Sequence, residues 1–256
     1  MESRVQYEAD GDLVVITLNR PERRNAIDAA ATAQLRDALD RLEGDERARV
    51  GILTGAGDRA FCAGMDLKAF AAGEGPAIVE GRGGFAGFTA YQRTKPVIAA
   101  VNGAALGGGC EIVLACDLVV AAETAVLGLP EVKRGLFASS GGALRLPLMI
   151  PRVRALELLL TGDAIDAAAA LSLGLVNRVV PAARVLEEAR ALGRRISANA
   201  PLSVRATLAV ARAACGPTEA HWSVTNSEWY GIVNSEDARE GPAAFAEKRP
   251  PRWQGR

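Results

Sequence analysis

One stretch of this chain, residues 97–117, constrains its fold more than any other. It opens with five apolar residues between a proline and an Asn-Gly pair, a pattern that predicts a short buried strand and a turn. Gly107, Gly108 and Gly109 follow, and then an apolar run over 112–116 predicts a buried helix. The glycines therefore stand at a helix N-terminus, where backbone N–H groups lack intrahelical partners and favour negative charge.

Glu111 places a carboxylate one turn into this otherwise apolar helix. Two interpretations are open from the stretch alone. An anion-stabilising backbone beside a carboxylate in apolar surroundings is a plausible part of an active site. The alternative is a tightly packed strand–helix corner that carries an exposed glutamate.

The charge balance argues against whole classes of partner. Lys+Arg and Asp+Glu are both 30, so the formal net charge is zero, and no broad attraction to nucleic acid or to an anionic membrane is expected. The four cysteines form no CxxC pair and the single histidine offers little for a metal cluster. This use of cysteine favours a reduced, cytoplasmic setting. The polar first ten residues lack the apolar core of a signal peptide, and no apolar run approaches ~20 residues, so no membrane segment is expected.

Strand and helix patterns alternate through most of the chain. Strands are expected over 13–18, 50–54, 118–121 and 175–180, and a helix over 29–42 with Asp28 as its N-cap. From residue 182 onward only helical patterns remain, at 185–198, 202–214, 219–233 and 237–247. The sequence therefore predicts an α/β core over 1–198, with the active site, and a helical region over 199–256.

Three further features stand near predicted turns. Gly64 precedes a helix start that leaves the N–H of Met65 free, although an ordinary capped helix start would look the same. The Gly- and Ala-rich residues 71–87 predict a mobile loop over a site, followed by a short helix over 88–94. Glu131 is a second carboxylate, at a turn that ends an apolar run.

Taken together, these pieces resemble the crotonase superfamily, also called the enoyl-CoA hydratase/isomerase family. The resemblance runs from Leu18 to Arg249, and its most specific motifs are 61–68, 100–112 and 129–131 followed by Gly141-Gly142 and 145–147. It implies an α/β fold, a spiral of repeated ββα units with a C-terminal helical oligomerisation region that builds trimers or dimers of trimers. It also implies acyl-CoA substrates and no metal or redox cofactor.

The resemblance assigns catalytic roles to four residues. The backbone N–H groups of Met65 and Gly108 would grip the thioester oxygen, on which enolate formation places negative charge. Glu131 would handle the α-carbon proton and Glu111 would orient the water. Two carboxyls close together in an apolar site cannot both ionise easily, so one keeps a proton for transfer. Met65 stands where close hydratases often have alanine, a change that should reshape the pocket more than the oxyanion hole.

The resemblance also implies positions that contact CoA. They fall in an early loop, in the segment lining the pantetheine path, and near the C-terminus, sometimes of a neighbouring subunit. They are Arg23, Arg24, Ala26, Ala63, Asp66, Leu67, Lys68, Phe245 and Lys248. For the charged members, a solvated surface side chain is the alternative interpretation.

Reversible hydration of a 2-enoyl-CoA is the leading expectation, because both glutamates are present. Carnitinyl-CoA dehydratases of the family resemble this chain over 66–69, 83–89 and the tail 235–249, which makes hydration of crotonobetainyl-CoA an alternative. A trimethylammonium group would favour aromatic neighbours, for which Phe85, Phe88 and Tyr91 are candidates. An enoyl-CoA isomerase and an acyl-CoA-binding protein without turnover are the further alternatives.

Overall fold

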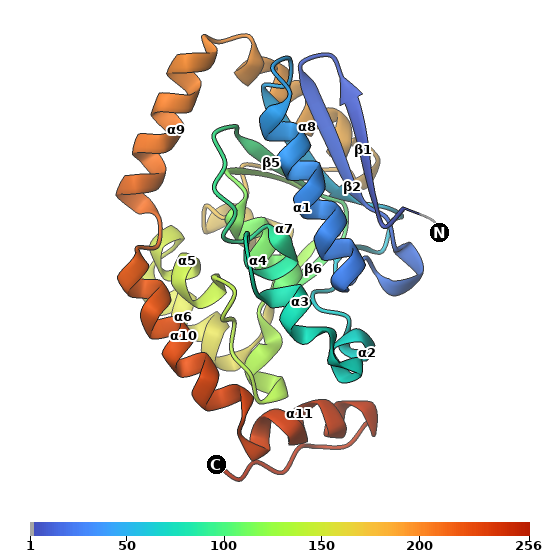
Figure 1. Ribbon diagram of the computed structural model, residues 1–256, viewed down its shortest axis with the longest axis vertical. Coiled ribbons are helices and arrows are strands. Elements are labelled where there is room, and N and C mark those ends of the chain that lie inside the picture. The colour runs from blue at the N-terminus through green and yellow to red at the C-terminus, as the bar shows by residue number, and fades with distance from the viewer. Residues whose placement is uncertain (1–2) are drawn as a thin grey trace.

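Two β-sheets form the centre of the computed structural model, which describes residues 3–256 (Figure 1). The larger sheet joins, in spatial order, β1 (Val5–Asp10), β2 (Leu13–Leu18), β3 (Val50–Gly55), β5 (Val97–Val101), β7 (Leu118–Ala122) and β10 (Arg178–Val180). The smaller sheet joins β4 (Ala60–Cys62), β6 (Ala104–Leu106), β8 (Val126–Gly128) and β9 (Ala164–Asp166).

The larger sheet is parallel except for its first hairpin. β1 pairs antiparallel with β2, and from β2 onward each strand pairs parallel with its neighbour, with Leu13 opposite Val50 and Ile98 opposite Leu118. The strands β2, β3, β5 and β7 are almost wholly buried. Parallel strands covered on both faces read as continuous apolar runs, which is why the sequence revealed them.

Consecutive strands alternate between the two sheets. The pairs β3–β4, β5–β6 and β7–β8 each give one strand to the larger sheet and the next to the smaller. Each pair is followed by a helical segment, so the repeated ββα unit implied by the resemblance is confirmed. Because β4, β6 and β8 run parallel, their carboxyl ends meet at one edge of the smaller sheet.

Helices surround the sheets. They are α1 (Ala29–Gly44), α2 (Leu67–Ala69), α3 (Gly75–Val79), α4 (Gly108–Ala115), α5 (Gly142–Met149), α6 (Arg152–Thr161), α7 (Ala167–Ser172), α8 (Val185–Ser197), α9 (Pro201–Cys215), α10 (Glu219–Val233) and α11 (Glu236–Ala246). Short helical segments of other types are η1 (Pro21–Arg23), η2 (Phe70–Glu74), η3 (Phe85–Gly87), η4 (Pro130–Arg134) and η5 (Ala182–Arg184). Asp28 begins α1 as predicted, since its carboxylate accepts a hydrogen bond of 2.8 Å from the N–H of Ala31.

The last three helices lie at the outside of the molecule. In Figure 1, α9 and α10 follow one edge and α11 crosses the end. Arg212 anchors α9, because its guanidinium donates to both carboxylate oxygens of Asp117 at 2.7 and 2.8 Å. Asp117 stands directly before β7, so this ion pair joins the outer helix to the sheet. The division of the chain at residue 198 stays a prediction.

The segment expected to be a mobile loop contains helical structure. Residues 70–87 hold η2, α3 and η3, and the side chains of Ile78 and Phe85 are buried in the core. Composition concealed this because a few large apolar residues, Ile78 and Phe85 among them, anchor a segment that is otherwise rich in glycine and alanine. The expected helix over 88–94 is wrong. That stretch forms turns around Phe88, whose ring is buried beneath the guanidinium of Arg93.

The strands missed by sequence reasoning are edge strands or very short ones. β1 lies at the sheet edge with only Val5 buried, and β4, β6 and β9 span three residues each. Among residues 3–256, none of the helices is both long and apolar enough to span a bilayer.

Candidate functional site

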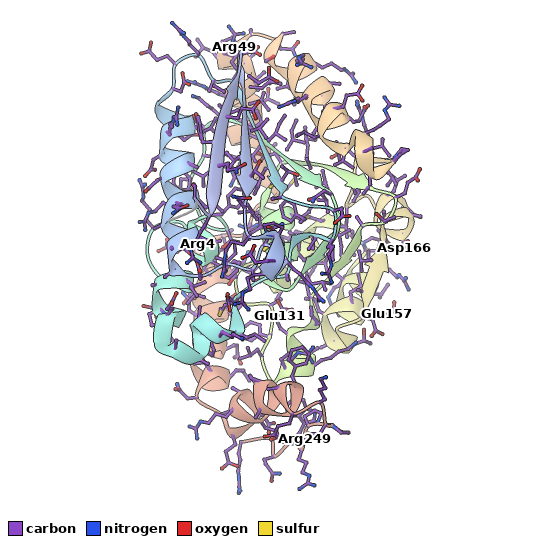
Figure 2. All side chains as sticks on the ribbon, turned by 90° about the vertical axis from the view of Figure 1, so that its right-hand side faces the viewer. Arg4, Arg49, Glu131, Glu157, Asp166 and Arg249 are labelled. Atoms are coloured by element: carbon purple, nitrogen blue, oxygen red, sulfur yellow. The ribbon has the colours of Figure 1, made fainter. Side chains whose placement is uncertain are left out.

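Three of the residues predicted to be catalytic follow neighbouring strands of the smaller sheet. Met65 comes after β4, Gly108 after β6 and Glu131 after β8. Since these strands are parallel neighbours, the three residues converge at the carboxyl edge of the sheet. Figure 2 places Glu131 near the middle of the molecule, between the strands and the C-terminal helices.

The chain segments that carry Met65 and Gly108 approach closely at Gly64. A Cβ atom on Gly64 would lie 3.0 Å from the backbone nitrogen of Gly108 and 2.9 Å from the carbonyl oxygen of Leu106, so only glycine allows this approach. Ile27 fixes the peptide of Met65 by a hydrogen bond on either side of it. Within the described residues, neither the N–H of Met65 nor that of Gly108 finds an acceptor.

Glu111 lies buried in the first turn of α4, with only 3% of its surface exposed. One carboxylate oxygen accepts a hydrogen bond of 2.9 Å from the N–H of Gly142, the first residue of α5. Burial raises the pKa of Glu111 to about 7, against the opposing effects of Gly142, Arg145 and Ser140. The alternative of an exposed glutamate at a packed corner is therefore wrong.

Glu131 lies at the start of η4, directly after the apolar run. Both of its carboxylate oxygens are buried and lack a hydrogen-bond partner among residues 3–256. A Cβ atom on Gly107 would lie 3.5 Å from one of them, so the carboxyl group faces the glycine run. Burial, followed by the charge of Glu111, raises the pKa of Glu131 to about 8.

The two carboxyls form a coupled pair. The charge of Glu111 is one of the causes that raise the pKa of Glu131, and both groups are removed from water. Near neutral pH such a pair holds one proton between its two members. A carboxylate, a carboxylic acid and two backbone N–H groups without acceptors therefore meet at one edge of the sheet, where they can move protons beside a stabilised oxyanion.

The early loop and the segment after β4 are joined by backbone contacts. The N–H of Ala63 donates to the carbonyl oxygen of Arg24 at 3.0 Å. Arg23 and Arg24 are exposed, as are Leu67 and Lys68. This part of the predicted CoA contact set is thus brought together on one surface.

Asp66 and Ala26 are occupied by structural contacts. The carboxylate of Asp66 caps α2 and pairs with Arg20 at 2.9 Å. Burial opposes ionisation of Asp66, but the hydrogen bonds from Arg20 and from two backbone amides outweigh it and lower the pKa. Ala26 is buried, and its carbonyl oxygen accepts from Arg20 at 2.5 Å.

The two C-terminal members of the set lie at and after the end of α11. Phe245 is half exposed, and the guanidinium of Arg134 in η4 lies 3.8 Å from the centre of its ring. Lys248 is exposed. Phe245 therefore contacts the short helix that carries Glu131.

The aromatic residues proposed for a cationic acyl group have other partners. Phe85 is buried against Gly108, and Arg93 lies 4.7 Å from the ring centre of Phe88. The Tyr91 hydroxyl donates to Asp40, and Arg82 lies over its ring. Phe88 and Tyr91 each already hold a cation of the protein, so the structure does not support these two as a trimethylammonium pocket.

The sequence placed Gly142 and Arg145 in a family motif and Ser140 in a stretch expected to line the acyl end, but it assigned none of them to Glu111. Gly142 donates to it, Ser140 lies beside it, and the charge of Arg145 acts on it. Trp222 of α10 in turn lies 5.5 Å from the Arg145 guanidinium. The available signal was an arginine within the otherwise apolar helix that follows Gly141-Gly142.

Comparisons with known proteins agree on one family. Residues 8–256 match the enoyl-CoA hydratase/isomerase family. A carnitinyl-CoA dehydratase of Proteus mirabilis is 43% identical over 262 residues, with full coverage of both chains.

Solved structures are similar over the whole chain as well. The crystal structure of a carnitinyl-CoA hydratase from Mycobacterium avium has a TM-score of 0.95 and 47% identity, with full coverage of both chains. That of an enoyl-CoA hydratase from Mycobacterium tuberculosis has a TM-score of 0.80 and 47% identity, also with full coverage of both.

Proposed function

Because the chain belongs to the enoyl-CoA hydratase/isomerase (crotonase) family, we propose that it is a hydro-lyase that interconverts a 2-enoyl-CoA and a 3-hydroxyacyl-CoA. The observation that carries this proposal is the pair of buried carboxyls, Glu111 and Glu131, beside two backbone N–H groups that have no acceptor in the described part of the chain. Addition of water across a conjugated thioester needs a base for the water and an acid for the α-carbon, and a pair sharing one proton supplies both.

In the hydration direction, Glu111 acts as the carboxylate and Glu131 as the acid. Glu111 takes a proton from water as the water oxygen bonds to the β-carbon, and Glu131 gives its proton to the α-carbon. The N–H groups of Met65 and Gly108 bind the thioester oxygen as negative charge grows on it. Dehydration runs the same steps backwards with the proton on the other glutamate. The proposed chemistry uses no metal or redox cofactor.

For the acyl group, we propose carnitinyl-CoA, which would be dehydrated to crotonobetainyl-CoA. Support comes from the full-length relatives and the structural neighbour named for this substrate. A simple short-chain 2-enoyl-CoA is the second candidate, because a neighbour of equal identity is named an enoyl-CoA hydratase. The exposed arginines of the early loop, Arg23 and Arg24, and Lys68 suit the phosphates of CoA.

Turnover of crotonobetainyl-CoA and of crotonyl-CoA, measured side by side, tests this proposal. We expect hydration of both, with the higher kcat/KM for crotonobetainyl-CoA. Glu111→Gln and Glu131→Gln should each lower kcat by at least about a hundredfold, since each removes one proton-transfer group. Binding of CoA should remain.

The matched control is Glu157→Gln, which removes an exposed carboxylate from α6. It should turn over substrate like the wild type. Wild-type turnover in either site variant would contradict the assigned roles. Absence of turnover of both thioesters by the wild type, with CoA still bound, would favour a binding protein.

A further inference from the structure

Arg145 is a partly buried cation for which the proposed reaction has no role so far. It stands in α5, one turn after Gly142, and its Nη2 donates to the carbonyl oxygen of Thr89 at 2.5 Å. Its Nη1 is buried and has no hydrogen-bond partner among residues 3–256. A buried guanidinium requires a nearby negative charge to offset its desolvation.

Three neighbours hold the guanidinium in place. Thr89 accepts its hydrogen bond, and Trp222 of α10 lies 5.5 Å from it. Gly141, in the left-handed region with φ of 113°, leaves the space that Nη1 fills, because a Cβ atom there would clash with the guanidinium. Gly141 immediately precedes the residue whose N–H binds Glu111.

The charges around this arginine leave Glu111 as its counter-charge. The groups that act on Arg145 are Glu111, the neighbouring Arg93 and the thiol of Cys116. Arg93 has its own partner in Asp117, at 3.9 Å. Burial raises the pKa of Cys116 to about 12, so this thiol is neutral.

Arg145 acts on one glutamate of the pair and not on the other. Glu111 accepts a hydrogen bond from the first turn of α5, whose positive dipole end favours a carboxylate, and the charge of Arg145 in the same helix acts on it. Glu131 faces Glu111 and the thiol of Cys110, which burial keeps protonated. Its own two oxygens have no hydrogen-bond partner within residues 3–256.

We propose that Arg145 is a positioning residue of this site, which together with the first turn of α5 holds Glu111 as the carboxylate of the pair and so leaves Glu131 as the acid. The inference rests on the proposed function, in which hydration needs this assignment of the proton. It also gives α10 a part in the reaction, because Trp222 packs on the guanidinium.

Replacement of the arginine charge tests the proposal directly. The protein, labelled with ¹³C at the glutamate carboxyl carbons, is titrated by NMR, and the Gln variants of Glu111 and Glu131 assign the two signals. In Arg145→Gln we expect the midpoint of Glu111 to rise by about one pH unit, because an attractive charge is lost. The ascending limb of kcat/KM for hydration should move with it, a loss of about fivefold near pH 7.

Two further variants separate charge from shape. Arg145→Lys keeps the positive charge but loses the planar, forked guanidinium. The titration midpoint of Glu111 in this variant should therefore stay near the wild-type value, while kcat falls. Arg154→Gln removes an exposed arginine of α6 and should change neither midpoint nor rate. An unchanged Glu111 midpoint in Arg145→Gln would overturn the proposal. If Arg145→Gln does not fold, a Glu111 midpoint displaced by a full unit in Arg145→Lys would overturn it.

The NMR midpoint does not depend on turnover. Failure of the proposed function would appear as missing hydration by the wild type, whatever the midpoints. Failure of the present inference would appear as intact hydration with a Glu111 titration that ignores Arg145.

Discussion

Glu111 and Glu131 share a burial that would be unfavourable for ordinary carboxylates. Glu111 is compensated by one backbone hydrogen bond and a nearby guanidinium, whereas both oxygens of Glu131 lack a partner in the described chain. Such a group holds its proton well above its ordinary pKa of 4.5. Burial of these two carboxyl groups therefore lowers the free energy of unfolding of the protein.

Stability should show this as a dependence on pH. Native Glu131 keeps its proton up to about pH 8, whereas in the unfolded chain it loses it near its ordinary value of 4.5. Stability is therefore lost as pH rises through this range, and Glu131→Gln, which cannot ionise, avoids the loss. We expect the variant to be more stable by several kcal/mol near pH 9, since each pH unit of this range costs about 1.4 kcal/mol, and unchanged near pH 4. Thermal unfolding of the wild type and the variant at both pH values measures this difference in stability.

The exposed Glu157→Gln should show no such difference between the two pH values. A Glu131→Gln variant whose melting temperature follows that of the wild type across the whole range would mean that Glu131 ionises normally in the folded protein.

Among the elements, the start of α4 carries the most constraints. The N–H of its first residue, Gly108, has no acceptor among the residues described, and the ring of Phe85 from η3 packs directly on its Cα. Phe85 belongs to the segment that composition described as a loop. That segment therefore holds the helix start in place, which explains why its apolar residues are buried.

Gly108→Ala should damage activity while the chain still folds. The new Cβ would overlap the Phe85 ring, so either the ring or the helix start must shift and the N–H leaves its position. Loss of one oxyanion donor typically lowers kcat by about 100-fold to 1,000-fold. Gly44→Ala is the control, because a Cβ there meets nothing within 4 Å. Steady-state kinetics with crotonyl-CoA measure this loss. A kcat of Gly108→Ala within a few fold of the wild-type value would show that Gly108 is not part of the oxyanion hole.

For the molecule as a whole, the outer helices leave apolar side chains uncovered. Leu202 and Val210 of α9, and Val224 and Tyr230 of α10, are each about two-thirds exposed or more. Water disfavours such exposure, and a second copy of the chain would remove it. We propose the homotrimer, or the dimer of trimers, that the resemblance implies.

A double variant tests this assembly. Leu202→Asp with Val210→Asp puts two charges on the exposed face of α9, where burial against another subunit would be unfavourable. We expect native mass spectrometry to give a trimer or hexamer for the wild type and a monomer for the variant. Circular dichroism should show that the helices persist. A monomeric wild type would contradict the proposed assembly.

The family resemblance, which the comparisons confirm, rests on short motifs whose properties depend on residues adjacent in the chain. Glycines before a helix, glutamates after apolar runs and strands covered on both faces all follow from neighbours in the chain, so the sequence determined the α/β class and named Glu111 and Glu131. It failed for residues 71–87, where the burial of Ile78 and Phe85 depends on contacts far along the chain, and it missed β1, a mostly exposed edge strand.

Only the tertiary structure decided how the site is completed. The parallel pairing of β4, β6 and β8 brings Met65, Gly108 and Glu131 to one edge. The contact between α4 and α5, in which the N–H of Gly142 binds Glu111, brings the charge of Arg145 to act on Glu111 rather than on Glu131. Both outcomes depend on distances through space between groups separated along the chain, and local patterns carry no information about these distances. The physical reason is that burial and every charge and hydrogen bond around the pair together decide which of the two glutamates holds the proton.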